Sequence, residues 1–391
     1  MKFYIIAGEA SGDLHASNLM RELKKVDASA QFRCWGGDMM KEQGAELVKH
    51  YKELAFMGFT EVLMNLRTIL KNIEFCKKDI LNFKPDVLIL VDYPGFNLRI
   101  AEFAKSRPCR DSSFGEKNGL KVFYYISPQI WAWKQSRVHH IKKYVDRMFA
   151  ILPFEKEFYK QFDYDIDFVG HPLLDALEQR QKTKDSFQDF TRKNNLSDKP
   201  IVAILPGSRK QEIEKMLPVM AEISSDFPDY QFVCAGISMH DKNFYSELIG
   251  KNDPDAAIGA GIKILFGKTY DLLEQSTAAL VTSGTATLET ALFGIPEVVC
   301  YKGGAISFQI AKCIVKVDYI SLVNLIMKKE VVKELIQNEF NKKNLKTELS
   351  KLLNDQVYRS KMIDDLSELK KQLGGFGASK KTAELMMKYL S

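Results

Sequence analysis

The chain has 391 residues, 46% of them hydrophobic, which is enough for roughly two to three domains and excludes wholesale disorder. Its formal net charge of +6 is only mildly basic, so a nucleic-acid partner is not expected, whereas an anionic substrate or membrane surface suits it. The six cysteines are scattered without a C-x-x-C pair, and no apolar run reaches the ~20 residues of a membrane span. We therefore expect a cytoplasmic protein whose only membrane contact is peripheral.

Short apolar runs alternate with helical patterns along the first half of the chain. Apolar runs without polar alternation, joined by helices, are typical of a parallel sheet covered on both faces. A helix is expected from about Asp13, after the first run. The predicted strands span residues 2–8, 31–37, 85–92, 121–127 and 147–153.

A charged stretch at residues 171–200 interrupts this alternation. A second series of apolar runs and helical patterns then follows. The second set of predicted strands spans residues 200–208, 231–236, 262–267, 278–285 and 296–301. The repetition predicts an α/β protein of two doubly wound Rossmann-like domains that face each other across a cleft. We expect domains over residues 1–170 and 201–359, a hinge over 171–200, and C-terminal helices at about 360–391 that complete the first domain.

Three predicted strand-to-helix junctions are rich in glycine and serine: AGEASGD at 7–13, LPGSRKQEIEK at 205–215 and TSGT at 282–285. In an open parallel sheet, ligands bind beyond the carboxyl ends of the strands, where helix N-termini offer N–H groups to phosphate oxygens. Serine also caps helices for structural reasons, so each junction alone has a second interpretation. Together they predict a substrate-binding set of Gly8, Glu9, Ser11, Gly12, Gly207, Ser208, Ser283, Gly284 and Thr285.

Arg209 and Glu289 add charge to the last two junctions. Arg209 supplies a permanent cation for a leaving group that gains negative charge. Glu289 falls about one helical turn after Thr285, where it could accept hydrogen bonds from a ribose diol or could simply favour the helix dipole. The chain contains neither G-x-x-x-x-G-K-[ST] nor G-x-G-x-x-G, so a nucleotide-sugar site is favoured over a P-loop or dinucleotide site.

Asp92 ends the apolar run LILVD and is followed by Tyr-Pro-Gly. A carboxylate at the carboxyl end of a buried strand can act as a general base, although an Asp before Pro-Gly also forms local turns. Glu9, at the end of the first predicted strand, is the rival carboxylate. Two D-x-D stretches occur, DYDID in a predicted strand and DPD in a polar loop, and neither is expected to hold a metal. We therefore predict no metal and no cofactor.

Residues 54–76 combine apolar positions at helical spacing with interspersed lysine and arginine. Such an amphipathic, basic-flanked helix suits a membrane interface, and the pattern alone fits a core helix equally well.

Ten motifs, in the family's order, resemble the lipid-A-disaccharide synthases, a family of glycosyltransferases of the GT-B fold. They are AGEASGD, GGDMM, LAFMGFTEVL, KPDVLILVDYPGFN, YYISPQIWAWK, LPFEKEFY, FVGHPLLD, LPGSRKQEI, SGTATLE and VDYISLVNLI. The resemblance covers nearly the whole chain and departs from the expected pattern mainly in a polar insertion at 106–121. It implies an inverting, metal-independent transfer from UDP-2,3-diacylglucosamine to 2,3-diacylglucosamine 1-phosphate at the cytoplasmic face of the inner membrane. The implied products are the β-1,6-linked lipid A disaccharide 1-phosphate and UDP.

The resemblance also assigns roles to residues. The family's active-site aspartate matches Asp92, its phosphate-binding arginine matches Arg209, and its nucleotide-binding glutamate matches Glu289. Asn324 matches a family position near the nucleotide. The family's membrane-associating segment matches 54–76, which gives a membrane role to Phe56, Met57, Leu63, Leu66, Ile69 and Leu70.

Two other functions remain open on the sequence. A UDP-sugar 2-epimerase has the same fold and would not need the apolar face at 54–76. A nucleotide-sugar-binding protein without turnover is the second alternative, and an aspartate at position 92 disfavours it. The expected partners are the two acylated substrates and the lipids of the membrane surface. A second copy of the chain, forming a homodimer, is left open.

Overall fold

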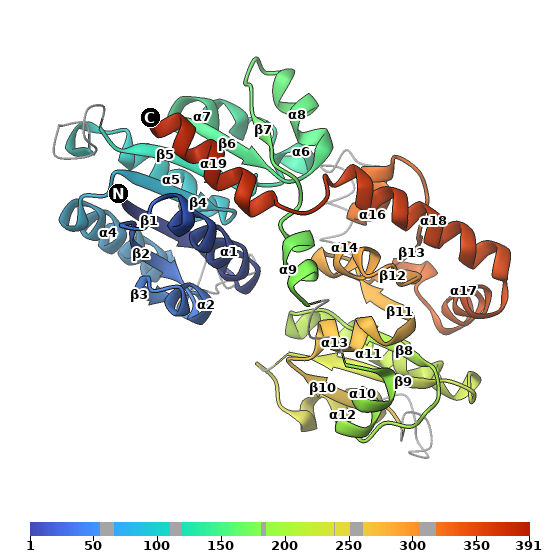
Figure 1. The fold of residues 1–391 in the computed structure, drawn as a ribbon. Coiled ribbons are helices and arrows are strands. Elements are labelled where there is room, and N and C mark those ends of the chain that lie inside the picture. The colour runs from blue at the N-terminus through green and yellow to red at the C-terminus, as the bar shows by residue number, and fades with distance from the viewer. Residues whose placement is uncertain (55–65, 110–118, 181–184, 238, 251–260, 305–317) are drawn as a thin grey trace. The chain divides into compact units, whose positions relative to one another are not determined.

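The computed structural model describes residues 1–54, 66–109, 119–180, 185–237, 239–250, 261–304 and 318–391 (Figure 1). The chain divides into two compact units. The first consists of Met1–Ala176 together with Leu373–Ser391, and the second is Leu177–Gln372. Each unit has its own parallel sheet and its own buried apolar core.

The sheet of the first unit has the order β3-β2-β1-β4-β5-β6-β7, and its paired strands are parallel. In β4 the whole run Val-Leu-Ile-Leu-Val is buried, because helices cover both faces of the sheet. The strands are β1 (Lys2–Ala7), β2 (Gln31–Gly36), β3 (Glu46–His50), β4 (Val87–Val91), β5 (Lys121–Tyr125), β6 (Arg147–Ala150) and β7 (Asp167–Phe168).

The helices of the first unit include one from the far end of the chain. Helix α19 packs against α1, as Figure 1 shows in red and dark blue. Helix α1 begins at Ala10, earlier than the predicted Asp13. The helices are α1 (Ala10–Val26), α2 (Asp38–Glu42), α4 (Leu66–Phe83), α5 (Pro94–Ala104), α6 (Ile130–Trp133), α7 (Arg137–Tyr144), α8 (Pro153–Lys160), α9 (Leu173–Arg180, which runs on into the second unit) and α19 (Ala378–Leu390).

The second unit also has a parallel sheet, with the strand order β10-β9-β8-β11-β12-β13. Its strands are β8 (Ile201–Leu205), β9 (Gln231–Gly236), β10 (Lys263–Phe266), β11 (Ser276–Thr282), β12 (Glu297–Tyr301) and β13 (Lys333–Ile336). Its helices are α10 (Phe187–Lys193), α11 (Lys210–Glu222), α12 (Lys242–Gly250), α13 (Thr269–Glu274), α14 (Thr285–Leu292), α16 (Leu322–Met327), α17 (Lys342–Asn354) and α18 (Gln356–Gln372).

Both sheets reverse their strand order at an inner pair, β1 with β4 and β8 with β11. At such a switch point, neighbouring connections leave toward opposite faces of the sheet and open a crevice beyond the carboxyl ends of the strands. The two inner pairs therefore position the candidate site residues of each unit.

The chain returns to the first unit later than the sequence predicts. Helix α18 belongs to the second unit as far as Gln372, and the first unit resumes at Leu373 rather than at about residue 360. The expected hinge at 171–200 contains helices α9 and α10. The backbone N–H of His171 donates to the carbonyl oxygen of Leu373 (3.0 Å), which joins the two segments where the chain re-enters.

Candidate active site

In the first unit, the predicted residues Gly8 and Glu9 follow β1, and Asp92 follows the neighbouring strand β4. A Cβ atom on Gly8 would lie 2.4–2.7 Å from the ring of Tyr93, so no side chain fits there. Glycine at position 8 therefore lets the two junctions approach each other. The structure brings Glu9 and Asp92 into electrostatic contact.

Asp92 is held in an unusual backbone conformation. Its φ of +44° lies in the left-handed region, and the next residue, Tyr93, also has a positive φ of +48°. The carbonyl oxygen of Asp92 accepts hydrogen bonds from the amide of Asn97 (2.7 Å) and the hydroxyl of Tyr124 (2.5 Å). Strain of this kind persists only where the surroundings fix it, and it occurs frequently at functional sites.

The electrostatic surroundings of Asp92 suit a proton acceptor. Burial, and after it the neighbouring charge of Glu9, raise the pKa of its carboxyl from 3.8 to about 7. A general base works best when its pKa lies near the working pH. Asn97 and Tyr124 were not singled out from the sequence, although an Asn five residues after the strand end is a visible signal.

The remaining residues of the first junction divide into two kinds. Ser11 is exposed in the first turn of α1, and Glu9 occupies the N-cap position of that helix without a side-chain capping hydrogen bond. Gly12 is buried, and a Cβ atom there would lie 3.2 Å from the side chain of Ala7. Asp13 accepts hydrogen bonds from three backbone N–H groups of residues 37–40 and anchors α2.

In the second unit, Gly207 and Ser208 follow β8, and Ser283 and Gly284 follow the neighbouring β11. Gly207 has a φ of +107°, and a Cβ atom there would lie 3.0–3.1 Å from the side chain of Glu212. Only glycine adopts this backbone without strain. Ser208, Gly284 and Thr285 are exposed, and Ser283 is half-buried.

Arg209 caps α11 and pairs with a carboxylate that the sequence analysis missed. Its guanidinium donates from Nη1 to Oε1 of Glu212 (3.0 Å), and the Arg209 side chain is 62% exposed. An exposed i,i+3 ion pair is worth at most about 1 kcal/mol, so the guanidinium can exchange this partner for a phosphate at little cost. The i,i+3 spacing of Arg209 and Glu212 was the signal that could have identified this pair.

Glu289 lies in the second turn of α14 and has a partner on α13. The hydroxyl of Tyr270 donates to Oε1 of Glu289 (2.9 Å), and the ring of Tyr270 packs against Phe293 at 5.5 Å. Burial raises the pKa of Glu289, while the hydrogen bond from Tyr270 opposes that rise. Nothing in the local sequence pattern links Tyr270 to Glu289, because the two residues meet only in the folded unit.

Asn324, predicted to contact the substrate, makes several hydrogen bonds within the second unit. Its side chain is fully buried, and its amide nitrogen donates to the carbonyl of Val332 and the carboxylate of Glu334, both at 2.9 Å. Its amide oxygen accepts from the backbone N–H groups of Val331 and Val332. These four bonds use the hydrogen-bonding capacity of its side-chain amide and hold the neighbouring segment in place. Ser283 reaches that segment through a 3.3 Å hydrogen bond to the carbonyl oxygen of Ile320.

The predicted membrane residues are only partly covered by the structure. Phe56, Met57 and Leu63 lie outside the described residues, and Leu66 is the first residue of α4. Ile69 packs against the core of the first unit, whereas Leu70 is 49% exposed. Within the described ranges, no helix is both long and apolar enough to cross a membrane.

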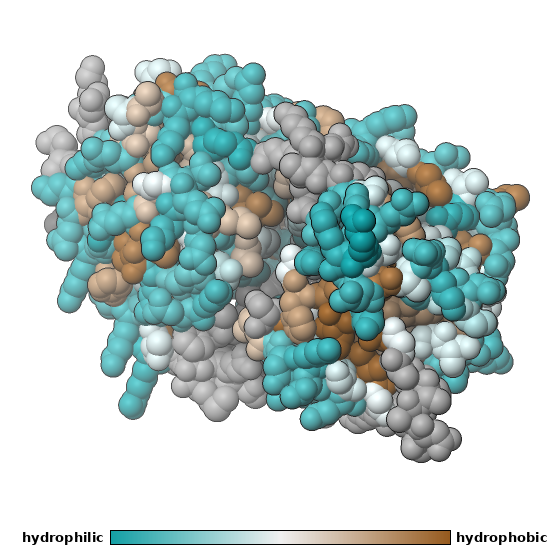
Figure 2. All heavy atoms as spheres, turned by 60° about the horizontal axis from the view of Figure 1, so that its bottom comes forward, coloured by the Kyte–Doolittle hydropathy of each residue, from teal (hydrophilic) through white to brown (hydrophobic). Residues whose placement is uncertain are grey.

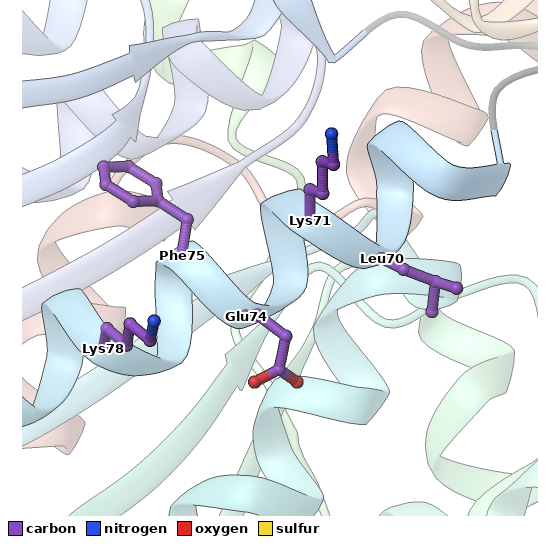
Figure 3. Close-up of a pocket in the computed structure, with 5 residues that line it drawn as sticks. All are labelled: Leu70, Lys71, Glu74, Phe75 and Lys78. Carbon is purple, nitrogen blue, oxygen red and sulfur yellow. The ribbon is translucent and has the colours of Figure 1, made fainter.

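The exposed side of α4 carries a shallow hollow of about 420 Å³. It is lined by Leu70, Lys71, Glu74, Phe75 and Lys78, and Figure 3 shows Lys71 and Phe75 on one side of the helix and Glu74 on the other. Phe75 is 50% exposed. On the face of the molecule drawn in Figure 2, most of the surface is hydrophilic and apolar side chains gather in limited patches.

Acidic residues at the two D-x-D stretches were not expected to bind metal. Asp163 pairs with Lys142 (3.1 Å), and Asp167 accepts a hydrogen bond from Tyr389 (3.0 Å). The second stretch, 253–255, lies outside the described residues. In the part of the chain that the structure covers, no three His, Cys, Asp or Glu side chains are grouped as metal ligands would be.

Solved structures with a similar fold bind nucleotide sugars. The UDP-GlcNAc 2-epimerase from Neisseria meningitidis, bound to UDP-GlcNAc, matches with a TM-score of 0.66 and 14% identity, over 99% of this chain and 100% of that one. The UDP-GlcNAc 2-epimerase from Methanocaldococcus jannaschii matches with a TM-score of 0.62 and 15% identity over the full length of both chains. At this identity the likeness concerns the fold alone, and it places the chain among the two-unit, Rossmann-like proteins of the GT-B class.

Sequence comparison defines the family. The model of the lipid-A-disaccharide synthetase family matches residues 3–388. The lipid-A-disaccharide synthase of Syntrophus aciditrophicus is 39% identical over 98% of this chain and 96% of its own length. That of Trichlorobacter lovleyi is 38% identical over the same shares. The chain therefore belongs to the lipid-A-disaccharide synthase family and is a glycosyltransferase.

Proposed function

We propose that this chain transfers a 2,3-diacylglucosamine residue from UDP to 2,3-diacylglucosamine 1-phosphate, forming the β-1,6-linked lipid A disaccharide 1-phosphate and UDP. Family membership supports the reaction class. The observation that carries the mechanism is Asp92, a partly buried carboxyl at the carboxyl end of β4 with a pKa raised to about 7. Such a group accepts a proton at neutral pH.

In the proposed mechanism, the 6-hydroxyl of the acceptor attacks the anomeric carbon of the donor in one displacement. Asp92 takes the hydroxyl proton as the new C–O bond forms, and the bond to the UDP oxygen breaks with its electron pair going to UDP. A single displacement inverts the anomeric carbon. Glu9, the rival base, lies at the N-cap position of α1, and its charge adds to the raised pKa of Asp92.

The second unit supplies the groups that suit UDP. The N-termini of α11 and α14 present backbone N–H groups and partial positive charge, which bind diphosphate oxygens. Arg209 is exposed at the first of these termini and stabilises the charge that develops on the leaving group. Glu289 accepts hydrogen bonds from the ribose diol. Because these groups balance the diphosphate charge, the proposed mechanism contains no metal ion.

Substrates with acyl chains reside in a bilayer, so the enzyme has to work at its surface. Helix α4 offers a suitable face, because Leu70 and Phe75 are exposed beside Lys71 and Lys78. Apolar side chains flanked by lysine bind an anionic interface through burial and charge together. We place this face against the cytoplasmic surface of the inner membrane.

The test is release of UDP from UDP-2,3-diacylglucosamine, measured with and without 2,3-diacylglucosamine 1-phosphate and repeated in EDTA. We expect UDP and a disaccharide only when the acceptor is present, and an unchanged rate in EDTA. Conversion of the donor to its 2-epimer without acceptor would replace the proposal with an epimerase. Binding of UDP without any product would indicate a nucleotide-sugar-binding protein, and loss of activity in EDTA with rescue by Mg²⁺ would bring a metal into the mechanism.

A further inference from the structure

A cavity of about 180 Å³ lies beside Asp92 within the first unit. Two of its lining side chains, Asp92 and Arg137, carry opposite charges, and Gln129 adds an amide. Asp92 follows β4, Gln129 precedes α6, and Arg137 begins α7, so three separate connections converge on it. The lining residues are Asp92, Pro94, Pro128, Gln129, Ile130 and Arg137.

The walls of this cavity are built by buried contacts. On one side, the hydroxyls of Ser127 and Tyr159 are hydrogen-bonded at 2.8 Å, and the ring of Trp131 packs edge-on against Phe154 at 4.9 Å. These contacts fix the connection that contains Pro128, Gln129 and Ile130. On the other side, the two hydrogen bonds to the Asp92 carbonyl oxygen fix the strand end. The cavity is therefore shaped before a ligand arrives, as binding sites generally are.

Arg137 contributes a permanent positive charge to this space. Its side chain is half-buried, and it is the first residue of α7. Burial raises the pKa of Tyr124 well above its usual value, and the charge of Arg137 opposes that rise.

A cavity with a proton acceptor on one wall and a guanidinium on another suits a molecule that carries both a reactive hydroxyl and an anionic group. Guanidinium groups bind phosphate oxygens with paired hydrogen bonds, which an ammonium group does not reproduce. We propose that this cavity binds the sugar phosphate of the acceptor, with its hydroxyl toward Asp92 and its phosphate on Arg137. The proposal rests on the proposed function and adds to it the residue that selects a phosphorylated acceptor.

The experiment compares two acceptors, 2,3-diacylglucosamine 1-phosphate and the same lipid without the phosphate, in the wild type and in Arg137→Ala. We expect Arg137→Ala to lower kcat/KM for the phosphorylated acceptor by about 10- to 100-fold, the range for losing a hydrogen-bonded charge partner. The KM for the UDP-sugar stays the same. With the acceptor that lacks phosphate, the wild type and Arg137→Ala have similar kcat/KM.

Two variants serve as controls. Arg137→Lys keeps the charge without the paired hydrogen bonds, so its rate with the phosphorylated acceptor falls between those of the wild type and Arg137→Ala. This variant tests the site even if Arg137→Ala is unstable. Lys143→Ala removes an exposed charge from the other end of α7 and leaves the rates unchanged. Equal losses with both acceptors, or a raised KM for the UDP-sugar alone, would overturn the assignment. If the wild type releases no UDP with either acceptor, the result contradicts the proposed function itself and not only the assignment of Arg137.

Discussion

At the scale of single residues, Asp92 gives the chain a definite pH dependence. A protonated carboxyl cannot accept the hydroxyl proton, so kcat/KM rises with pH and levels off above an apparent pKa of about 7. Asp92→Asn keeps the shape and removes the base, and we expect it to lose nearly all turnover while still binding UDP. Steady-state rates between about pH 5 and pH 9, with UDP binding measured by calorimetry, check both statements.

Glu9 provides the control for that prediction. Burial is the larger cause of the raised pKa of Asp92, and the charge of Glu9 is the next, so Glu9→Gln should move the acidic limb of the profile to lower pH. If the acidic limb of the pH–rate profile does not move in Glu9→Gln, the charge of Glu9 does not influence the pKa of Asp92. If Glu9→Gln is inactive and Asp92→Asn is active, Glu9 and not Asp92 is the general base. Because the folded pKa of Asp92 exceeds its unfolded value, this residue also makes the protein less stable as pH rises from 3.8 to about 7.

At the scale of elements, α4 has two faces that a pair of substitutions can separate. Leu70 and Phe75 are exposed, whereas Ile73 and Ile80 are buried in the core of the first unit. We expect the double variant Leu70→Ser with Phe75→Ser to bind anionic vesicles more weakly, since it removes exposed apolar surface from α4. Sedimentation with vesicles of defined anionic lipid content, at low and high salt, measures the change.

The matched control is Ile80→Ala on the opposite face of α4. This variant leaves a cavity and should lower the free energy of unfolding by about 2–5 kcal/mol while the folded protein still binds vesicles normally. Normal vesicle binding by the double variant would mean that α4 is not the docking element. A large loss of stability in the double variant would mean that Leu70 and Phe75 act as core residues.

The sequence predicted the fully buried strands, and of the half-buried edge strands it predicted β10 but not β3 or β13. All five residues of β4 are buried and form one apolar run, which made that strand evident. Strands β3 and β13 were missed because each lies at the edge of a sheet, is mostly half-buried and contains charged residues. An edge strand faces solvent along one side, so its composition resembles that of a loop.

The candidate site could also be predicted only in part from the sequence, but for a different reason. Strand ends and glycines are local features, and the sequence placed Asp92 and Gly207 at such ends. The partners that fix a site come from distant segments: Tyr124 holds the Asp92 backbone from β5, and Tyr270 holds Glu289 from α13. Pairings of this kind depend on the completed sheet and leave no periodic pattern in one sequence.

At the scale of the whole molecule, the chain passes between its two units twice, near Ala176 and again near Gln372. The second passage allows α19 to complete the first unit, where Ala383 and Met386 are fully buried and the helix packs on α1. The start of α19 is fixed by Asp175, a buried residue of α9. The terminal helix is thus tied to the segment through which the chain first leaves that unit.

Asp175 accepts hydrogen bonds from the backbone N–H groups of Gly377 (2.6 Å), Ala378 (3.2 Å) and Ser379 (2.8 Å). A carboxylate at a helix N-terminus satisfies donors that the helix itself cannot, and it complements the helix dipole. Asp175→Ala leaves these donors without their carboxylate, so we expect the free energy of opening α19 to fall by about 1–3 kcal/mol. Hydrogen exchange of the α19 amides measures this, and Asp364→Ala, an exposed aspartate on α18, should change it by less than about 0.5 kcal/mol. Equal exchange in the two variants would show that packing against α1, without the carboxylate, is sufficient to hold the terminal helix in place.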